Sequence, residues 1–182
     1  DQSMTRFLPG GNRSSIYSTS VIVTTVLSIV FGVGYLLTAG LWSPGIQIGW
    51  GAAVVLLVLM ASWSVALTSN MAFVAIREAR VSFVQTLVMG TRVLVLFVTT
   101  AMGAVGIIGA YAASFVLAVI YGQIIFARLG IFVKEVDWQF IKDSMRFSSG
   151  NWVSGLLDNL PLYILPVLVF GYLGAAQTAE YY

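Results

Sequence analysis

Two ionisable side chains stand inside long apolar stretches of the sequence, where a charge is costly. Arg92 lies in the apolar run over about 84–102, and Asp158 lies next to Asn159 in the run over about 152–173. Arg92 lies roughly ten residues inside its run, and Asp158 lies about ten residues past residues 147–148, so at about 1.5 Å per helical residue both reach a depth of about 15 Å. Ionised groups at such depth in a membrane usually face a cavity or a partner, and they mark candidate functional sites.

Two interpretations of these charges stay open. In the first, Arg92 and Asp158 form a structural pair, or Asp158 reaches toward the interface together with Asn159. In the second, the three residues line a polar pathway. Arg92 would then attract an anionic group, and Asp158 would bind a coupling cation or a proton. We take Arg92, Asp158 and Asn159 as the candidate pathway residues.

Two prolines follow Asp158 within the same run. Pro161 and Pro166 each remove a backbone donor, so the freed carbonyls need neighbours or water within the bilayer. Such bent helices often line transport sites, although a fixed kink that aids packing explains the same residues. The sequence therefore predicts a kinked helix at Pro161 and Pro166.

The elements that hold these residues must lie in lipid. The chain has 182 residues, of which 59% are hydrophobic and 9% charged, and its mean hydropathy is +0.94. Soluble domains carry roughly 25% charged residues, because their surface must be solvated. Residues 14–76 and 93–127 contain no charged side chain. This pattern predicts an integral membrane protein.

Five runs are long enough to cross the bilayer, which takes about 20 apolar residues per helix. They cover approximately 17–41, 49–69 (continuing toward 76), 84–102, 105–127 and 152–173. The runs are apolar on all faces, whereas barrel strands alternate in polarity. The expected fold is therefore all-α, with about five transmembrane helices. Trp42 and the turn at 43–45 would anchor the end of the first helix, and Gly103 would connect the third and fourth.

The basic residues predict the orientation. All nine Lys and Arg residues except Arg92 lie before the first run, between the second and third, or between the fourth and fifth. The positive-inside rule makes that side cytoplasmic, so the N-terminus is expected inside and the end of the chain outside. The expected location is the cytoplasmic membrane, with the lipid bilayer as a partner. The polar opening and the end of the chain beyond an apolar run predict an internal piece of a longer membrane protein.

Several classes of function are disfavoured. The chain contains neither Cys nor His, and only Glu135 and Asp137 form a close acidic pair. These features argue against thiol chemistry, a bound metal and enzymatic activity. No basic cluster of the kind found in nucleic-acid-binding proteins is present. We therefore expect no enzyme, no cofactor, no metal site and no nucleic-acid partner.

Two further patterns concern packing. Small residues recur at every fourth position of the fourth run, at Gly106, Ala110, Ser114, Ala118 and Gly122, which predicts close approach of another helix. Residues 137–146 place apolar side chains on one helical face behind Asp137, a suitable N-cap. A short helix on the cytoplasmic interface, or a packed connector, is expected there.

Several segments together resemble a known family. They are residues 4–9 (MTRFLP), 73–84 (FVAIREARVSFV) with Gln85, 147–151 (FSSGN), 160–161 (LP), 165–166 (LP) and 171–174 (GYLG). The chain resembles the polysaccharide-biosynthesis (Wzx-type) flippases of the multidrug/oligosaccharidyl-lipid/polysaccharide exporter superfamily. Its five runs are similar to helices three to seven of that family in number, direction and loop length.

The resemblance implies a two-lobed transporter of 12–14 helices around a central cavity. Residues 1–16 would be a cytoplasmic loop, 17–127 four helices of the first lobe, 128–147 the cytoplasmic linker with its short helix, and 148–182 the first helix of the second lobe. It also implies that the complete protein moves lipid-linked oligosaccharide between leaflets by alternating access, with the remaining helices as partners. Asp158 and Asn159 would line the cavity.

Other functions remain open at this point. A multidrug or metabolite exporter of the same superfamily fits the same fold, since a fold does not determine the substrate. A lipid-phosphate membrane enzyme and a purely structural membrane protein are further alternatives.

Overall fold

The computed structural model describes residues 2–42 and 49–146, together with residues 149, 153, 154, 157 and 160. The chain divides into two units, Asp1–Phe140 and Ile141–Tyr182. The first unit holds the helices that are discussed below. In the second unit, residues 141–146 are helical.

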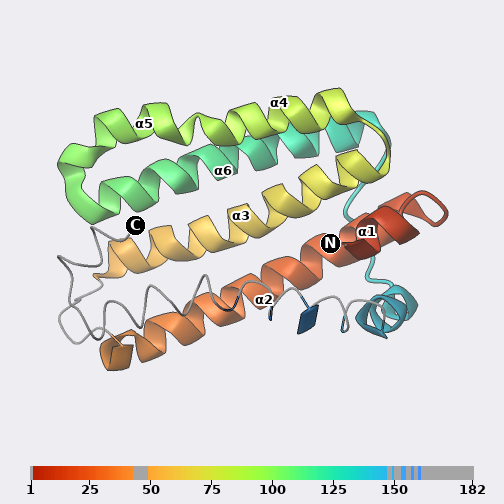
Figure 1. The fold of residues 1–182 in the computed structure, drawn as a ribbon, viewed down its shortest axis with the longest axis horizontal. Coiled ribbons are helices and arrows are strands. Elements are labelled where there is room, and N and C mark those ends of the chain that lie inside the picture. The colour runs from red at the N-terminus through yellow and green to blue at the C-terminus, as the bar shows by residue number, and fades with distance from the viewer. Residues whose placement is uncertain are drawn as a thin grey trace. The chain divides into compact units, whose positions relative to one another are not determined.

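The described part is built from helices alone (Figure 1). They are α1 (Gln2–Phe7), α2 (Arg13–Trp42), α3 (Trp50–Ala75), α4 (Ala79–Gly90), α5 (Arg92–Thr99), the short 3-10 helix η1 (Thr100–Met102) and α6 (Gly103–Arg128). Four segments are long and apolar enough to cross a membrane: Arg13–Ala39, Trp50–Ala75, Ala79–Met102 and Val105–Arg128. The all-α prediction and the first, second and fourth expected spans are confirmed.

The sequence predicted that the third span begins at about residue 84. In the structure it begins at Ala79. The apolar run and the helix do not start together, because a helix can extend beyond the hydrocarbon with a charged first turn. Arg80 supplies that charge. Most of the predicted fifth span and the whole turn at 43–45 lie outside the described residues.

Consecutive spans run in opposite directions, so that α3 and α6, which occupy the middle of the first unit, run in the same direction (Figure 1). α2 packs chiefly on α3, whereas α4 and α5 pack on α6. The start of α2, the α3–α4 turn and the end of α6 therefore lie at one end of the bundle, on the right of Figure 1. Arg13, Arg77, Arg80 and Arg128 lie in or next to these segments, so we call this the basic end.

Two helices end in the same hydrogen-bonded turn at the basic end. After α6, the amide of Ile131 donates to the carbonyl of Phe126 at 2.9 Å, and Gly130 adopts φ +71°. After α3, the amide of Glu78 donates to the carbonyl of Phe73 at 2.9 Å, and Arg77 adopts φ +65°. Both are Schellman turns, which favour Gly at the left-handed position. The α3–α4 turn instead places an arginine there.

The core of the basic end is an aromatic column. The Phe126 ring of α6 stacks on Tyr17 of α2 at 4.1 Å between ring centroids and on Phe73 of α3 at 4.2 Å. All three side chains are buried, and Met4 and Leu8 pack into the same cluster. Residues 1–16 were expected to be a loop, but they contain α1 and the first turn of α2. The burial of Met4 and Leu8 in this cluster holds the segment against the bundle.

Hydrogen bonds join the segment after α6 to the start of α2. The amide of Lys134 donates to the Ser18 hydroxyl at 3.0 Å, and the amide of Asp137 donates to the Thr19 hydroxyl at 2.7 Å. The Asp137 carboxylate accepts a hydrogen bond from the amide of Phe140 at 2.9 Å. Asp137 is thus the N-cap of the predicted short helix, whose first residues, 138–140, are helical.

The small residues of α6 lie where the sequence predicted close packing. Ala110, Ser114 and Ala118 are buried. A Cβ added at Gly122 would lie 2.9 Å from Nε2 of Gln85 and 3.5 Å from Cβ of Ser69. This stripe therefore lets α3 and α4 approach the backbone of α6, and the packing prediction is confirmed.

Candidate functional site

A series of buried and partly buried hydrogen bonds joins three helices next to the aromatic column. Nε2 of Gln123 on α6 donates to the hydroxyl of Tyr17 on α2 at 2.6 Å. The Ser69 hydroxyl on α3 donates to the Val65 carbonyl at 2.7 Å, so it has no hydrogen left for Tyr17. The Tyr17 hydroxyl must therefore donate to Ser69, which lies 3.0 Å away. The hydrogen bonds therefore run in one direction, from Gln123 through Tyr17 to Ser69.

A second polar contact joins α3, α4 and α6. The side chain of Gln85 is fully buried, and its Nε2 donates to the carbonyl of Ala118 at 3.2 Å. Nδ2 of Asn70 lies 3.0 Å from the Ser82 carbonyl and 3.4 Å from Oε1 of Gln85. The small side chain of Ala118 leaves its carbonyl accessible, so Gln85 can bond to the backbone of α6. These polar groups have partners within the bundle, which is typical of helix packing in lipid.

Arg92, the predicted intramembrane charge, is held by aromatic rings. Its guanidinium carbon lies 5.0 Å from the centroid of the Tyr111 ring and 5.7 Å from that of Phe115, both on α6. Phe115 in turn stacks on Trp63 of α3 at 5.5 Å with an interplanar angle of 8°. We call Arg92, Tyr111, Phe115 and Trp63 the arginine–aromatic cluster. Cation–π contacts contribute about 0.5–2 kcal/mol, more as water is excluded.

The helix is interrupted at Thr91, next to this arginine. α4 ends at Gly90 and α5 begins at Arg92, with Thr91 between them. The Thr91 hydroxyl donates to the Val88 carbonyl at 2.7 Å and lies 3.4 Å from the hydroxyl of Ser114. Since the span begins at Ala79, Arg92 lies about 20 Å from its basic end and about 15 Å from Met102, at about 1.5 Å per residue. It therefore remains near mid-depth.

The guanidinium is half-buried, and among the residues that the structure describes no carboxylate forms an ion pair with it. Its N–H groups are planar donors suited to a carboxylate or a phosphate. Asp158, Asn159, Pro161 and Pro166 lie outside the described residues. The predicted pairing of Arg92 with Asp158, the polar pathway and the kinked helix therefore stay predictions.

Tyr111 and Phe115 were not among the residues predicted from the sequence. Counting from the turn at Gly103 would have found them. Arg92 precedes Gly103 by about as many residues as Phe115 follows it, so the two sides of a helical hairpin bring them to one depth. Tyr111 lies one helical turn before Phe115 and shares its face. Gly103 itself adopts φ +65°, as a very short connection requires.

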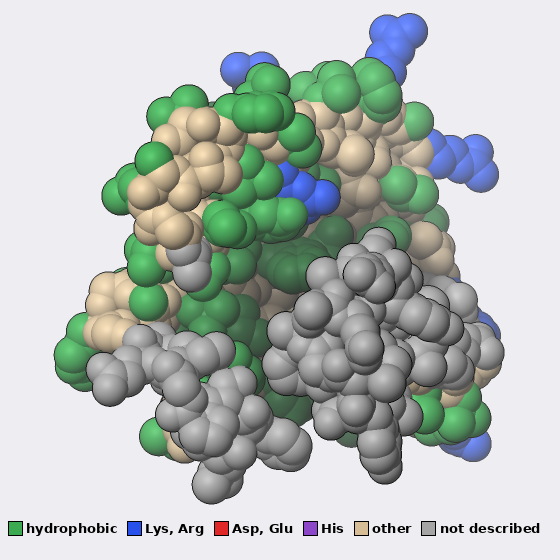
Figure 2. All heavy atoms as spheres, turned by 60° about the vertical axis from the view of Figure 1, so that its left-hand side comes forward, with side chains coloured by type: hydrophobic (Ala, Val, Ile, Leu, Met, Phe, Trp, Pro, Cys, Tyr) green, Lys and Arg blue, Asp and Glu red, His purple; other side chains and the backbone are tan. Residues whose placement is uncertain are grey.

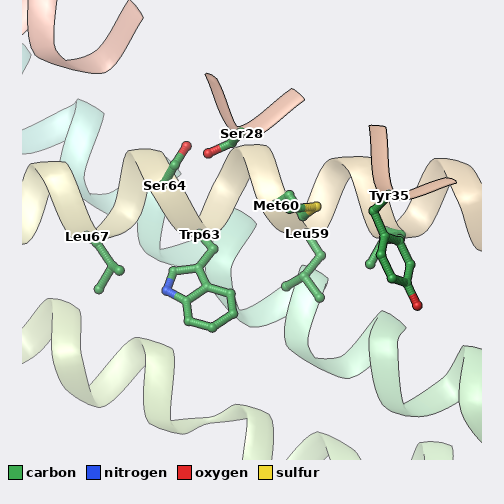
Figure 3. A pocket seen from close by; sticks show the side chains of 8 residues that line it. Ser28, Tyr35, Leu59, Met60, Trp63, Ser64 and Leu67 are labelled. Carbon is green, nitrogen blue, oxygen red and sulfur yellow. The ribbon is translucent and has the colours of Figure 1, made fainter. Parts of the chain in front are cut away.

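A groove of about 520 Å³ runs along the seam between α2 and α3 (Figure 3). It is lined by Ser28, Tyr35, Leu56, Leu59, Met60, Trp63, Ser64 and Leu67. Figure 2, turned so that the left-hand side of Figure 1 comes forward, shows many hydrophobic side chains over the described part of that face. Trp63 belongs both to this groove and to the arginine–aromatic cluster, so the two features are adjacent.

Comparisons with protein-family models, with curated proteins and with solved structures found no match. Within residues 2–42 and 49–146, no group of three or more His, Cys, Asp or Glu side chains is placed to hold a metal ion. By the length and composition of its helices, the chain is a multi-pass membrane protein.

Proposed function

We propose that this chain is part of a flippase of the polysaccharide-biosynthesis family, which moves lipid-linked oligosaccharide across the cytoplasmic membrane by alternating access. Its four described spans would be helices three to six, and residues 152–173 would be helix seven. The alternating direction of the spans and the gathering of loop arginines at one end support this assignment. The basic end would face the cytoplasm.

The observation that carries the proposal is the arginine–aromatic cluster. A lipid-linked oligosaccharide carries phosphate groups, which must cross the hydrocarbon layer. An arginine near mid-depth, 5.0 Å from the Tyr111 ring and without an ion-pair partner in the described segments, offers free donors along such a path. Arginine binds phosphate oxygens through paired hydrogen bonds, which become stronger as water is excluded.

Asp158 and Asn159 complete the proposed pathway from the seventh helix. A carboxylate at Asp158 would bind the coupling cation or proton, or neutralise Arg92 when no substrate is bound. Pro161 and Pro166 would bend that helix beside the pathway.

Transport by the complete protein in vesicles tests the proposal. A fluorescent lipid-linked oligosaccharide pyrophosphate is added to one leaflet, and its appearance in the other is followed by quenching. We expect Arg92→Gln to lower the initial rate about tenfold, which corresponds to the loss of about 1.4 kcal/mol of binding. Arg92→Lys should keep part of the activity.

Arg80→Gln is the matched control, because it removes the same charge from the basic end of the same span. It should leave the rate within about twofold, as expected for a solvated charge. A normal rate in folded Arg92→Gln would contradict the role of the cluster. Transport of cationic drugs together with failure to move the oligosaccharide lipid would favour the exporter instead.

A further inference from the structure

The arginine–aromatic cluster contains a second hydrogen-bond donor besides Arg92. The Tyr111 side chain is half-buried, and the centroid of its ring lies 5.0 Å from the guanidinium carbon. Its hydroxyl lies on the edge of that ring, and no hydrogen bond joins it to the residues that the structure describes. An unpaired O–H group inside a membrane span costs free energy, so this hydroxyl needs an acceptor.

Arg92 keeps its own donors at the same place. An aromatic ring attracts the charge of a guanidinium through its π face, which leaves the N–H groups available to other acceptors. The rings of Tyr111 and Phe115 hold Arg92 in this way, at 5.0 and 5.7 Å. The planar N–H groups of arginine match two oxygens of a carboxylate or a phosphate. Arg92 therefore presents a pair of donors, and Tyr111 presents a single donor beside it.

The neighbouring hydroxyls add no free donor. The Thr91 hydroxyl donates to the Val88 carbonyl at 2.7 Å, and the Ser114 hydroxyl donates to the Ala110 carbonyl at 3.0 Å. Both hydrogens are thus used within their own helices. In the described part of the chain, no carboxylate forms an ion pair with Arg92. The cluster therefore combines a cation with a free hydroxyl donor, a combination that fits an anionic ligand.

The packing around the cluster fixes the positions of these donors. Phe115 is buried and stacks on Trp63 at 5.5 Å, with an interplanar angle of 8°. Met89 and Ala118 are buried in the same core, and Tyr111 packs against it. Side chains that are held by packing present their polar groups in one geometry, which is what selection between similar ligands requires.

The two anions that match arginine differ in their number of oxygens. A carboxylate has two, and a paired contact with a guanidinium engages both. A phosphate ester offers a third acceptor oxygen, which remains available for another donor. A hydroxyl beside the guanidinium therefore adds a contact that a phosphate completes and a carboxylate does not.

We propose that Tyr111 donates a hydrogen bond to the phosphate group that Arg92 binds, and that it thereby selects phosphate over carboxylate. This inference rests on the proposed role of Arg92, to which it adds the residue that selects the class of anion. Arg92 supplies the charge and the paired N–H contact. The Tyr111 hydroxyl reaches the remaining oxygen, while its ring keeps the guanidinium in place.

Two amphiphiles with the same alkyl chain test the proposal. The complete protein in phosphatidylcholine nanodiscs is titrated with dodecyl phosphate or with dodecanoate. Binding is followed through the fluorescence of Trp63, which stacks on Phe115. The Trp63→Phe protein gives the signal that comes from elsewhere. We expect the parent to bind dodecyl phosphate about tenfold more tightly than dodecanoate, as expected for one more hydrogen bond to a charged group.

Tyr111→Phe removes the O–H group and keeps the ring over which Arg92 lies. We expect the dissociation constant for dodecyl phosphate to rise about tenfold and that for dodecanoate to stay within about twofold, so the preference disappears. Tyr121→Phe is the matched control, because it makes the same change at another half-buried tyrosine of α6, ten residues further along. It should keep the preference of the parent.

Arg92→Gln separates this inference from the proposed function, because it should weaken the binding of both amphiphiles. Equal loss of both in Tyr111→Phe, or loss of neither, would overturn the role of Tyr111 and leave that of Arg92 intact. A parent that binds the two amphiphiles equally, or binds neither, would also overturn it. Unchanged binding in folded Arg92→Gln, together with a normal transport rate, would instead contradict the proposed function.

Discussion

At the scale of single residues, the hydroxyl of Tyr17 is one polar group that connects three helices. It accepts a hydrogen bond from Gln123 at 2.6 Å and donates one to Ser69 at 3.0 Å, while its ring stacks on Phe126. The hydroxyl thus links α2 to both of its neighbours at the basic end. Removing it while keeping the ring isolates the polar contribution.

We expect Tyr17→Phe to lower the free energy of unfolding by about 1 kcal/mol, within the range measured for interhelical hydrogen bonds in membrane proteins. Thermal unfolding in detergent micelles measures the change. Tyr35→Phe is the matched control, because the Tyr35 side chain is 48% exposed and no hydrogen bond of its hydroxyl is found in the described segments. Equal destabilisation by both substitutions would contradict the role given to the Tyr17 hydroxyl.

Arg77 is a second residue with a local and measurable effect. Its φ of +65° is strained for a side chain with a Cβ, and the equivalent position after α6 is Gly130. We expect Arg77→Gly to stabilise the protein by about 0.5–1 kcal/mol, because the relief of strain exceeds the added freedom of glycine in the unfolded chain.

The reverse change, Gly130→Ala, should destabilise by about 1 kcal/mol. Arg80→Gly removes the same charge from the first turn of α4, where the backbone is helical, and should destabilise slightly. Unfolding in micelles compares the three variants. A loss of stability in Arg77→Gly would show that the arginine side chain contributes more than its backbone conformation costs.

At the scale of elements, the hairpin of α5, η1 and α6 depends on glycines with different roles. A Cβ added at Gly106 would collide with the carbonyl oxygen of Thr99 and lie 2.8 Å from Cβ of Met102. A Cβ added at Gly109, one turn further along α6, would meet no atom of the described residues within 4 Å. The tight turn between α5 and α6 therefore requires glycine at position 106, whereas position 109 has room for a larger side chain.

We expect Gly106→Ala to destabilise the protein by about 1–3 kcal/mol, since the backbone of the turn must move. Gly109→Ala should be neutral or stabilising by up to about 1 kcal/mol, because alanine favours the helix. Resistance to proteolysis at the η1 turn and thermal unfolding both measure this difference. Similar behaviour of the two variants would mean that the hairpin is looser than the structure indicates.

At the scale of the whole molecule, the distribution of charge predicts how the protein lies in the membrane. The α3–α4 turn and the segment after α6 share the basic end, while Met102 lies at the opposite end of the third span. The chain contains no cysteine, so each introduced cysteine is a unique label. The positive-inside rule places the basic end in the cytoplasm.

We expect Glu78→Cys and Glu135→Cys to react with a membrane-impermeant maleimide only when the cytoplasmic face is accessible. Met102→Cys, at a side chain that is 69% exposed, should react only from outside. Labelling of intact cells and of inside-out vesicles measures the two faces. Reaction of Glu78→Cys and Glu135→Cys from opposite faces would contradict the topology and the flippase assignment together.

The amino-acid sequence by itself determined the membrane class, the existence and order of four spans, the basic end and the small-residue face of α6. Each follows from local properties: the length of an apolar run, the absence of charge, the place of arginine in loops and a four-residue period. Even the turn at Gly103 was predictable, because the apolar runs on either side leave no other residues for a connection.

The tertiary structure alone decided which side chains meet. It brought Arg92 to Tyr111 and Phe115, joined Gln85 to the backbone of α6, and left the groove between Ser28 and Ser64. Helices that are apolar on every face carry no polarity difference to indicate which side faces a neighbour. In lipid, the fit of side chains and a few interhelical hydrogen bonds make that choice, and neither can be read from hydropathy.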